Sequence, residues 1–332
     1  MKKIDYLTGL KGLAALLVVA HHFSIAFFPG VYWDSGMLTH ISGDIEAIFR
    51  MTPLGCILNG NFAVCLFFIV SGFVLSYSYF KHKNYDKLKK QIFLRYFKLA
   101  IPIMLVLIIV YFFVKLGFMY NFEASKITGS AMWLGTFFRT DFSLLQVLKE
   151  GILTVFMQPS GGYLTVLWTI HYEIVGSILA YIVSFIVLDN KKRSWIYVLL
   201  IIFFAKTYYV LFIFGVILAD LYLNRKSIFE RLNKPVISFV LIIMVIYLGG
   251  YPSGVIPTSG IYFWITKLPL GMEPYLACHF LAGLVVVLLV LSSKPCQKLL
   301  ALKPFQKLGN ISFSMYLLHV VVICSLSSYL FL

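Results

Sequence analysis

The chain has 332 residues, of which 61% are hydrophobic and only 12% are charged, and its formal net charge is +15. Soluble domains carry roughly 25% charged residues, so this composition excludes an ordinary soluble protein. The positive charge does not indicate nucleic-acid binding, because the basic residues form short groups between apolar runs, as the positive-inside rule predicts for cytoplasmic loops.

Apolar runs recur along the whole chain, and many are about as long as a membrane-spanning helix, which needs roughly 20 residues. The basic groups between these runs predict a cytoplasmic N-terminus. In chain order, spanning helices are expected over residues 7–28, 61–80, from the basic loop 81–90 to 118, 163–188, 195–205, 208–223, 236–248, 275–291, and from 311 to the end. Outer loops are expected over 32–60, with one interfacial helix, and over 121–162, with a surface helix near 144–157.

This pattern predicts an all-α fold, a polytopic transmembrane bundle of about nine to ten helices. The segments 195–205 and 208–223 are barely long enough to cross a bilayer, so they need tilt or burial among other helices. Nothing in the composition marks a separate soluble domain, and we expect residues 1–332 to form a single integral-membrane domain. The five cysteines are scattered without a metal-ligand spacing, which predicts no metal site.

Ionisable side chains inside a bilayer are costly, so those within the apolar runs are functional candidates. They are Lys11, His21, His22, His171, Glu173, Asp220, His279 and His319. Lys11 and His22 are eleven positions apart on the first helix. At about 100° per residue they point to nearly the same face, roughly 16 Å apart along the axis. We therefore expect them to line one cavity at two depths.

Such an arrangement suits acyl transfer between two compartments. Lys11 at the cytoplasmic mouth would hold the phosphates of an acyl-CoA donor, and His22 would act as general base for an acceptor hydroxyl. Histidine suits that role because its unperturbed pKa lies near working pH. The alternative is structural: Lys11 extends to the lipid headgroups and His22 packs between helices. The spacing alone does not decide between the catalytic and the structural interpretation of Lys11 and His22.

The segment LTGLKGLAALLVVAHH, Leu7–His22, resembles the opening of the membrane acyltransferase 3 family, whose members acylate surface polysaccharides, peptidoglycan and some small molecules. That family has an Asp-Gly-Leu-Arg-Gly segment with the arginine eleven residues before a histidine. The histidine corresponds to His22, the arginine to Lys11 and the aspartate to Thr8. Lysine keeps the charge of arginine but lacks its planar fork, so it is not an equivalent clamp for phosphate.

Two further segments resemble signatures of this family. FFIVSGFVL resembles its second-helix motif, in which the small Ser71 and Gly72 are expected to let helices approach closely. Arg95 and Lys98 match an arginine-rich beginning of the third helix, and the resemblance implies that they lie near the phosphates of the donor. The alternative for both is an anchor at the cytoplasmic surface.

Trp168 and Glu173, in WTIHYE, match a Trp-x-x-x-x-Glu element of the family. Glu173 lies within an apolar helix and needs a partner. We expect it to orient a histidine or to pair with Lys11 or Arg95, unless it forms a purely structural ion pair. The closing LGNISFSMYLLH matches a final family signature, which makes His319 a further candidate for the site.

The resemblance implies a membrane O-acyltransferase that moves an acyl group, expected to be acetyl, from cytoplasmic acyl-CoA to a hydroxyl of a cell-surface glycan or its lipid-linked precursor. The expected partners are the lipid bilayer, acyl-CoA, a glycan such as an exopolysaccharide, and glycan-assembly enzymes, in the inner membrane of a bacterium. Two alternatives remain. One is a transporter or flippase that uses intramembrane His, Glu and Lys, and the other is a non-catalytic partner in a glycan-assembly complex.

Overall fold

The computed structural model describes residues 4–34, 39–41, 43–139, 142–159 and 161–332, which form helices and connecting turns without any strand. The longer helices are α1 (Asp5–Phe27), α3 (Gly60–His82), α4 (Tyr85–Lys115), α8 (Trp168–Val187), α9 (Arg193–Phe204), α10 (Tyr209–Asn224), α12 (Pro235–Gly249), α13 (Pro274–Ser292) and α15 (Lys303–Val322). The shorter helices are α2 (Ile45–Met51), α5 (Asn121–Thr128), α6 (Leu144–Lys149), α7 (Val155–Met157), α11 (Lys226–Leu232), α14 (Lys294–Leu300) and α16 (Ser328–Phe331). Short 3-10 segments are η1 (Pro29–Val31), η2 (Pro53–Leu58), η3 (Leu134–Thr136), η5 (Thr165–Leu167) and η6 (Phe263–Lys267), and π-helical segments are η4 (Glu150–Thr154) and η7 (Ile323–Ser327).

Six helices in the described part of the chain are long and apolar enough to cross a membrane. They are α1, α3, α4, α8 with its preceding turn, α13, and α15 continued through α16. The pair α11 and α12 is bent by 87° and adds a seventh if it counts as one span. All nine segments expected from the sequence are helical, but α9 and α10 are shorter than a span. The structure is therefore a multi-pass helical bundle, and the expected count of nine to ten crossing helices is not confirmed.

Three predicted boundaries differ from the structure. The loop expected over 81–90 is mostly helical, because the Asn84 side chain accepts a hydrogen bond from the backbone N–H of Lys87 at 2.8 Å and caps the first turn of α4. The last helix begins at Lys303 instead of at 311. The segment 121–162, expected as a loop, contains α5, which was not expected. The surface helix expected near 144–157 is divided into α6, η4 and α7.

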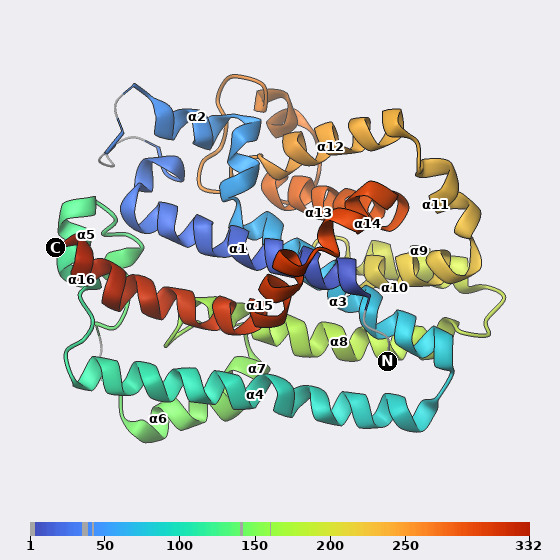
Figure 1. Cartoon of the computed structure of the whole chain (residues 1–332), viewed down its shortest axis with the longest axis horizontal. Helices are drawn as coiled ribbons and strands as arrows, with labels where there is room; N and C mark the ends of the chain where they lie inside the picture. Colours follow the sequence, from blue (N-terminus) through green and yellow to red (C-terminus); the bar gives the residue numbers. More distant parts are fainter. Residues whose placement is uncertain (1–3, 35–38, 42, 140–141, 160) are drawn as a thin grey trace.

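The central helix of the bundle is α3, the most buried of the spans, which packs against α1, α8, α10 and α13 (Figure 1). Its closest approach is to α10. A Cβ on Gly72 would collide with the backbone of Phe212, and a Cβ on Gly215 would collide with the backbone of Ile69 and Phe73. The prediction that Gly72 lets helices approach closely is confirmed.

A second close crossing joins α1 to α15. A Cβ on Gly12 would meet the backbone of Leu308 and Gly309, and a Cβ on Gly309 would meet the carbonyl of Thr8. Gly309 therefore lies inside a continuous helix, at the point where the two helices touch. This contact brings the two ends of the chain together and positions the side chains of α1 and α15 against each other.

Replacing Gly309 by valine should destabilise the bundle by about 1–3 kcal/mol or more, because its side chain would have to displace the backbone of α1. The thermal midpoint of the detergent-solubilised protein measures this effect. Ile311→Ala is the matched control, since Ile311 lies on the same helix and is 54% exposed. Equal midpoints for the two variants would contradict the close crossing.

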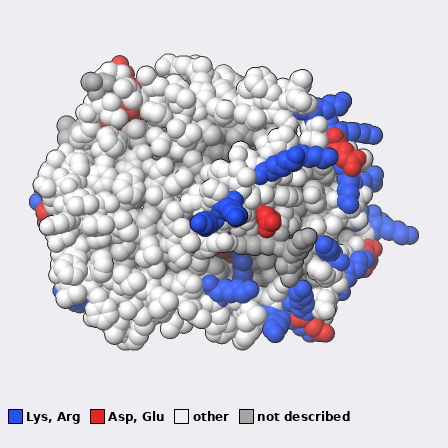
Figure 2. All heavy atoms as spheres, viewed as in Figure 1, with Lys and Arg blue, Asp and Glu red and all other residues white. Residues whose placement is uncertain are grey.

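The charged side chains are unevenly distributed over the molecule. On the face shown in Figure 2, most Lys and Arg gather at the right-hand end, where α3 joins α4 and α8 leads to α9 in Figure 1. Helix α1 begins toward this end and α16 ends at the opposite one, which shows few charges. The side of the membrane on which the N-terminus lies stays a prediction.

Candidate active site

A cavity of about 290 Å³ lies between α1, α3, α4, α8 and α15. Five of the residues predicted for the site line it, namely Lys11, Ser71, Arg95, Lys98 and Glu173. Its apolar wall includes Val64, Phe67, Phe68, Leu99, Ile170 and Phe313. The structure thus brings together side chains from all five segments that resemble family signatures.

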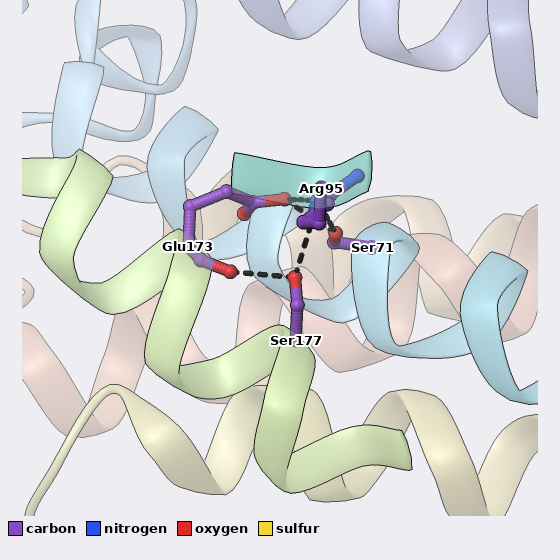
Figure 3. Close-up of polar contacts among 4 residues, drawn as sticks. All are labelled: Ser71, Arg95, Glu173 and Ser177. Carbon is purple, nitrogen blue, oxygen red and sulfur yellow. Dashed lines mark hydrogen bonds and ion pairs between the residues drawn. The ribbon is translucent and has the colours of Figure 1, made fainter. Parts of the chain in front are cut away.

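The polar part of the cavity is built around an ion pair between Arg95 on α4 and Glu173 on α8 (Figure 3). Ser71 on α3 donates a hydrogen bond to Glu173 Oε1 at 2.6 Å and accepts one from Arg95 Nη2 at 2.9 Å. Arg95 Nε also donates to Ser177 Oγ at 3.2 Å. Of the partners considered for Glu173, the structure therefore selects Arg95, and Ser71 contributes hydrogen bonds in addition to its small size.

The cavity carries a net positive charge. Three cations, Lys11, Arg95 and Lys98, and one carboxylate, Glu173, line it. The Arg95 and Glu173 side chains are only 22% and 18% exposed, so their mutual pairing balances both charges within the bundle. Lys98 is exposed at the surface. Such a concave, positively charged site attracts an anionic ligand.

His22 and His319 form a second polar centre. His22 Nδ1 lies 2.7 Å from His319 Nε2, and the two rings are nearly parallel, with centroids 4.9 Å apart. His319 is 5% exposed. The pairing shows that the final signature and the opening one meet in space. It makes His319 a direct neighbour of the predicted base.

The expectation that Lys11 and His22 line one cavity is wrong at the His22 end, because the residues that line the cavity include Lys11 but not His22. Tyr316 is close to both regions. Its side chain lines the cavity, and its ring centroid is 5.9 Å from that of His319. The Tyr316 hydroxyl is held by Thr169 Oγ1 at 2.8 Å. The aromatic ring one helical turn before His319 thus lies both at the cavity and near the histidine pair.

Sequence reasoning missed Trp133 as a site residue. Its ring stacks on His22, with centroids 5.1 Å apart and planes 11° from parallel. Trp133 precedes η3 in the segment between α4 and α8, more than 100 positions from α1, so only the tertiary fold brings it to His22. Trp168, by contrast, does not line the cavity and packs against Tyr172 and Tyr208.

His21 contacts the segment that connects α1 to α3. Its Nδ1 donates a hydrogen bond to the carbonyl of Leu58 at 2.8 Å, and its ring meets that of Tyr32 edge-on at 5.4 Å. Burial raises the pKa of the Tyr32 phenol, which therefore stays protonated. His21 and Tyr32 line a cavity of about 20 Å³, which has room for a single water molecule.

Taken together, these features define a multi-pass helical membrane protein with a basic cavity beside an enclosed pair of histidines. The family model described as an acyltransferase domain matches residues 4–332, and the chain therefore belongs to the acyltransferase 3 family. It is a membrane acyltransferase. No curated protein and no solved structure matches the chain.

Proposed function

We propose that this membrane acyltransferase moves an acetyl group from cytoplasmic acetyl-CoA to a hydroxyl of a cell-surface glycan or of its lipid-linked precursor, in the inner membrane of a bacterium. The observation that carries the proposal is the pair of adjacent sites: a basic cavity suited to an anionic donor, and a histidine pair suited to proton transfer. Residues 1–332 act in this proposal as one unit. The bilayer and glycan-assembly enzymes are its expected partners.

The proposed binding site for the acyl donor is supported by the charge and size of the cavity. Lys11, Arg95 and Lys98 supply cations for the phosphates of CoA. A volume of about 290 Å³ is at the lower limit for small-molecule sites. It suits only part of the donor, so the adenosine would stay at the surface beside the exposed Lys98.

The proposed orientation of the bundle in the membrane is supported by its charges. The positive-inside rule assigns the basic end in Figure 2 to the cytoplasm. Because α1 begins toward that end, this proposed orientation puts Lys11 nearer the cytoplasm than His22. Donor and acceptor would then reach the reaction centre from opposite sides of the membrane.

In the proposed reaction, His22 acts as general base. It removes the proton of the acceptor hydroxyl while the hydroxyl oxygen attacks the thioester carbonyl. The new C–O bond forms, the C–S bond breaks, and the leaving thiolate takes the proton back from His22, so the products are the ester and free CoA thiol. Since His22 is not among the residues that line the cavity whereas Tyr316 is, we propose that donor entry turns the Tyr316 ring aside.

Lys11→Ala should raise the KM for acetyl-CoA about 10–100-fold, because hydrogen bonds to charged groups contribute about 1.5–3 kcal/mol. Lys11→Arg should stay close to wild type, since the charge is kept. Steady-state kinetics with purified protein in lipid nanodiscs measure both. Lys307→Ala is the control, because Lys307 is basic but is not among the residues that line the cavity. An unchanged KM in both Lys11 variants would remove Lys11 from the donor site.

The proposal itself is tested with acetyl-CoA labelled in its acetyl group. Purified protein in nanodiscs receives the labelled donor together with a lipid-linked oligosaccharide or a surface polysaccharide of the host. We expect label to appear on the glycan as an alkali-labile ester, with release of an equal amount of free CoA. Release of CoA without labelled glycan would show that the acceptor belongs to another class.

A further inference from the structure

The hydrogen bonds of His319 determine which of its ring nitrogens carries a proton. His319 Nδ1 lies 3.2 Å from the carbonyl oxygen of Met315, one turn earlier on α15. A carbonyl oxygen only accepts hydrogen bonds, so Nδ1 must be the donor. A neutral imidazole that is protonated at Nδ1 has its lone pair on Nε2. His319 therefore offers Nε2 as an acceptor.

The hydrogen bond to His319 determines the protonation of the His22 ring in the same way. His22 Nδ1 lies 2.7 Å from His319 Nε2, and since that atom accepts, His22 Nδ1 donates. A neutral His22 that is protonated at Nδ1 has its lone pair on Nε2. No group in the described part of the chain hydrogen-bonds this second nitrogen of His22. The nitrogen that can remove a proton is thereby left available.

We propose that His319 is a positioning residue that holds His22 in one tautomer, with Nδ1 protonated and Nε2 unprotonated, and in one ring orientation. This inference rests on the proposed function, because it assigns the direction in which the base acts. The chain Met315 carbonyl, His319, His22 performs the task that a carboxylate performs behind the histidine of a Ser-His-Asp triad. It does so without a negative charge inside the bundle.

The packing around His22 supports a single ring position. Trp133 stacks on His22 at a centroid distance of 5.1 Å, and His319, itself buried, holds its Nδ1 edge. The opposite tautomer of His22 would break the hydrogen bond to His319 or force His319 to give up its bond to Met315. Either change leaves a buried polar atom without its partner, which is unfavourable. The acceptor hydroxyl must therefore approach the Nε2 edge of His22.

The test compares His319→Gln with His319→Leu in the labelled-acetyl assay. The side-chain oxygen of glutamine can occupy the place of His319 Nε2 and accept the hydrogen bond from His22, whereas leucine cannot accept one. We expect His319→Leu to lower kcat by about 100-fold or more and to leave the KM for acetyl-CoA unchanged. His319→Gln should keep kcat within about tenfold of wild type, because its side-chain oxygen still accepts the hydrogen bond from His22.

His171→Gln is the matched control. His171 also lies on a spanning helix and is hydrogen-bonded to the carbonyl of Phe156 and to Tyr209, but it is not among the residues that line the cavity. It should keep kcat near wild type. All variants are compared at equal monodispersity and thermal midpoint, so that loss of fold is recognised separately from loss of positioning.

Two results would overturn the inference while the proposed function stands. One is a His319→Leu variant that keeps the kcat of the active wild type. The other is a folded His319→Gln variant as inactive as His319→Leu, because His319 would then need to exchange a proton instead of only accepting a hydrogen bond. A wild-type protein that transfers no acetyl group under any acceptor would overturn the proposed function and the inference together.

Discussion

His22→Ala is expected to lower kcat for acetyl transfer by about 10²–10⁴-fold, the range that general-base catalysis contributes. The loss falls on kcat because His22 is not among the residues that line the cavity and does not take part in holding the donor there. The bundle should persist, since alanine fits at a helix position and removes no backbone contact. Single-turnover transfer of labelled acetyl measures the chemical step directly.

His21→Asn is the matched control for that variant. The asparagine side-chain amide can replace His21 Nδ1 as the donor to the Leu58 carbonyl, so the hydrogen bond between α1 and η2 is kept. We expect its kcat to stay within a few-fold of wild type, as for a residue that does not touch the reacting atoms. Full activity of His22→Ala, or an equal loss in both variants, would contradict the role of His22 as the base.

Glu173→Leu is expected to destabilise the bundle by about 3 kcal/mol, because it leaves the Arg95 guanidinium within the helices without its counter-charge. Arg95→Leu should have a similar effect, since it leaves the carboxylate unpaired. The double variant, with leucine at both positions, should recover most of the lost stability, since apolar replacements of a buried pair are often neutral. It should nevertheless stay deficient in transfer, because the cavity has then lost Arg95 as one of its three cations.

Thermal midpoints of the single and double variants form a double-mutant cycle, and the kinetics of the double variant separate the structural role of the pair from its functional role. The exposed pair of Lys83 and Asp189, 3.2 Å apart, is the control. Lys83→Met should cost less than about 1 kcal/mol. Strictly additive losses in the double variant would show that Arg95 and Glu173 do not stabilise each other. Normal transfer by a stable double variant would assign them a purely structural role.

The spanning segments were predictable because apolar runs of sufficient length have few alternatives in a bilayer. The ends of these helices were less predictable. Whether Gly309 interrupts a helix or permits a close crossing depends on Thr8, which lies about 300 positions earlier, and local sequence carries no sign of that contact. The start of α4 at Tyr85 was hidden among basic residues that are typical of a loop, although Asn84 is a recognisable capping residue.

The cavity residues Lys11, Ser71, Arg95, Lys98 and Glu173 were predictable from charges inside apolar runs and from the resemblance to the family. The shared cavity for Lys11 and His22 was wrong because helical periodicity gives the direction of a side chain but not what lies between two of them. The cavity wall near His319 includes Tyr316, which comes from the other end of the chain.

The histidine pair and the stacking of Trp133 were not predictable for the same reason. His22 and His319 are separated by 297 positions, and their contact depends on the crossing of α1 and α15. His319 itself was a candidate, because it is an ionisable residue within an apolar run and belongs to the closing segment that resembles a family signature. Its partner was not, since neither spacing nor composition relates the two segments.

We propose that this protein places acetyl groups on a surface glycan through His22. The most direct measurement is mass spectrometry of that glycan from cells that lack the gene and from cells that carry wild type or His22→Ala at equal membrane abundance. We expect one added acetyl group per repeat with the wild type only. A glycan whose mass is the same in all three strains, with altered uptake of a solute in the strain that carries wild type, would contradict it and favour transport.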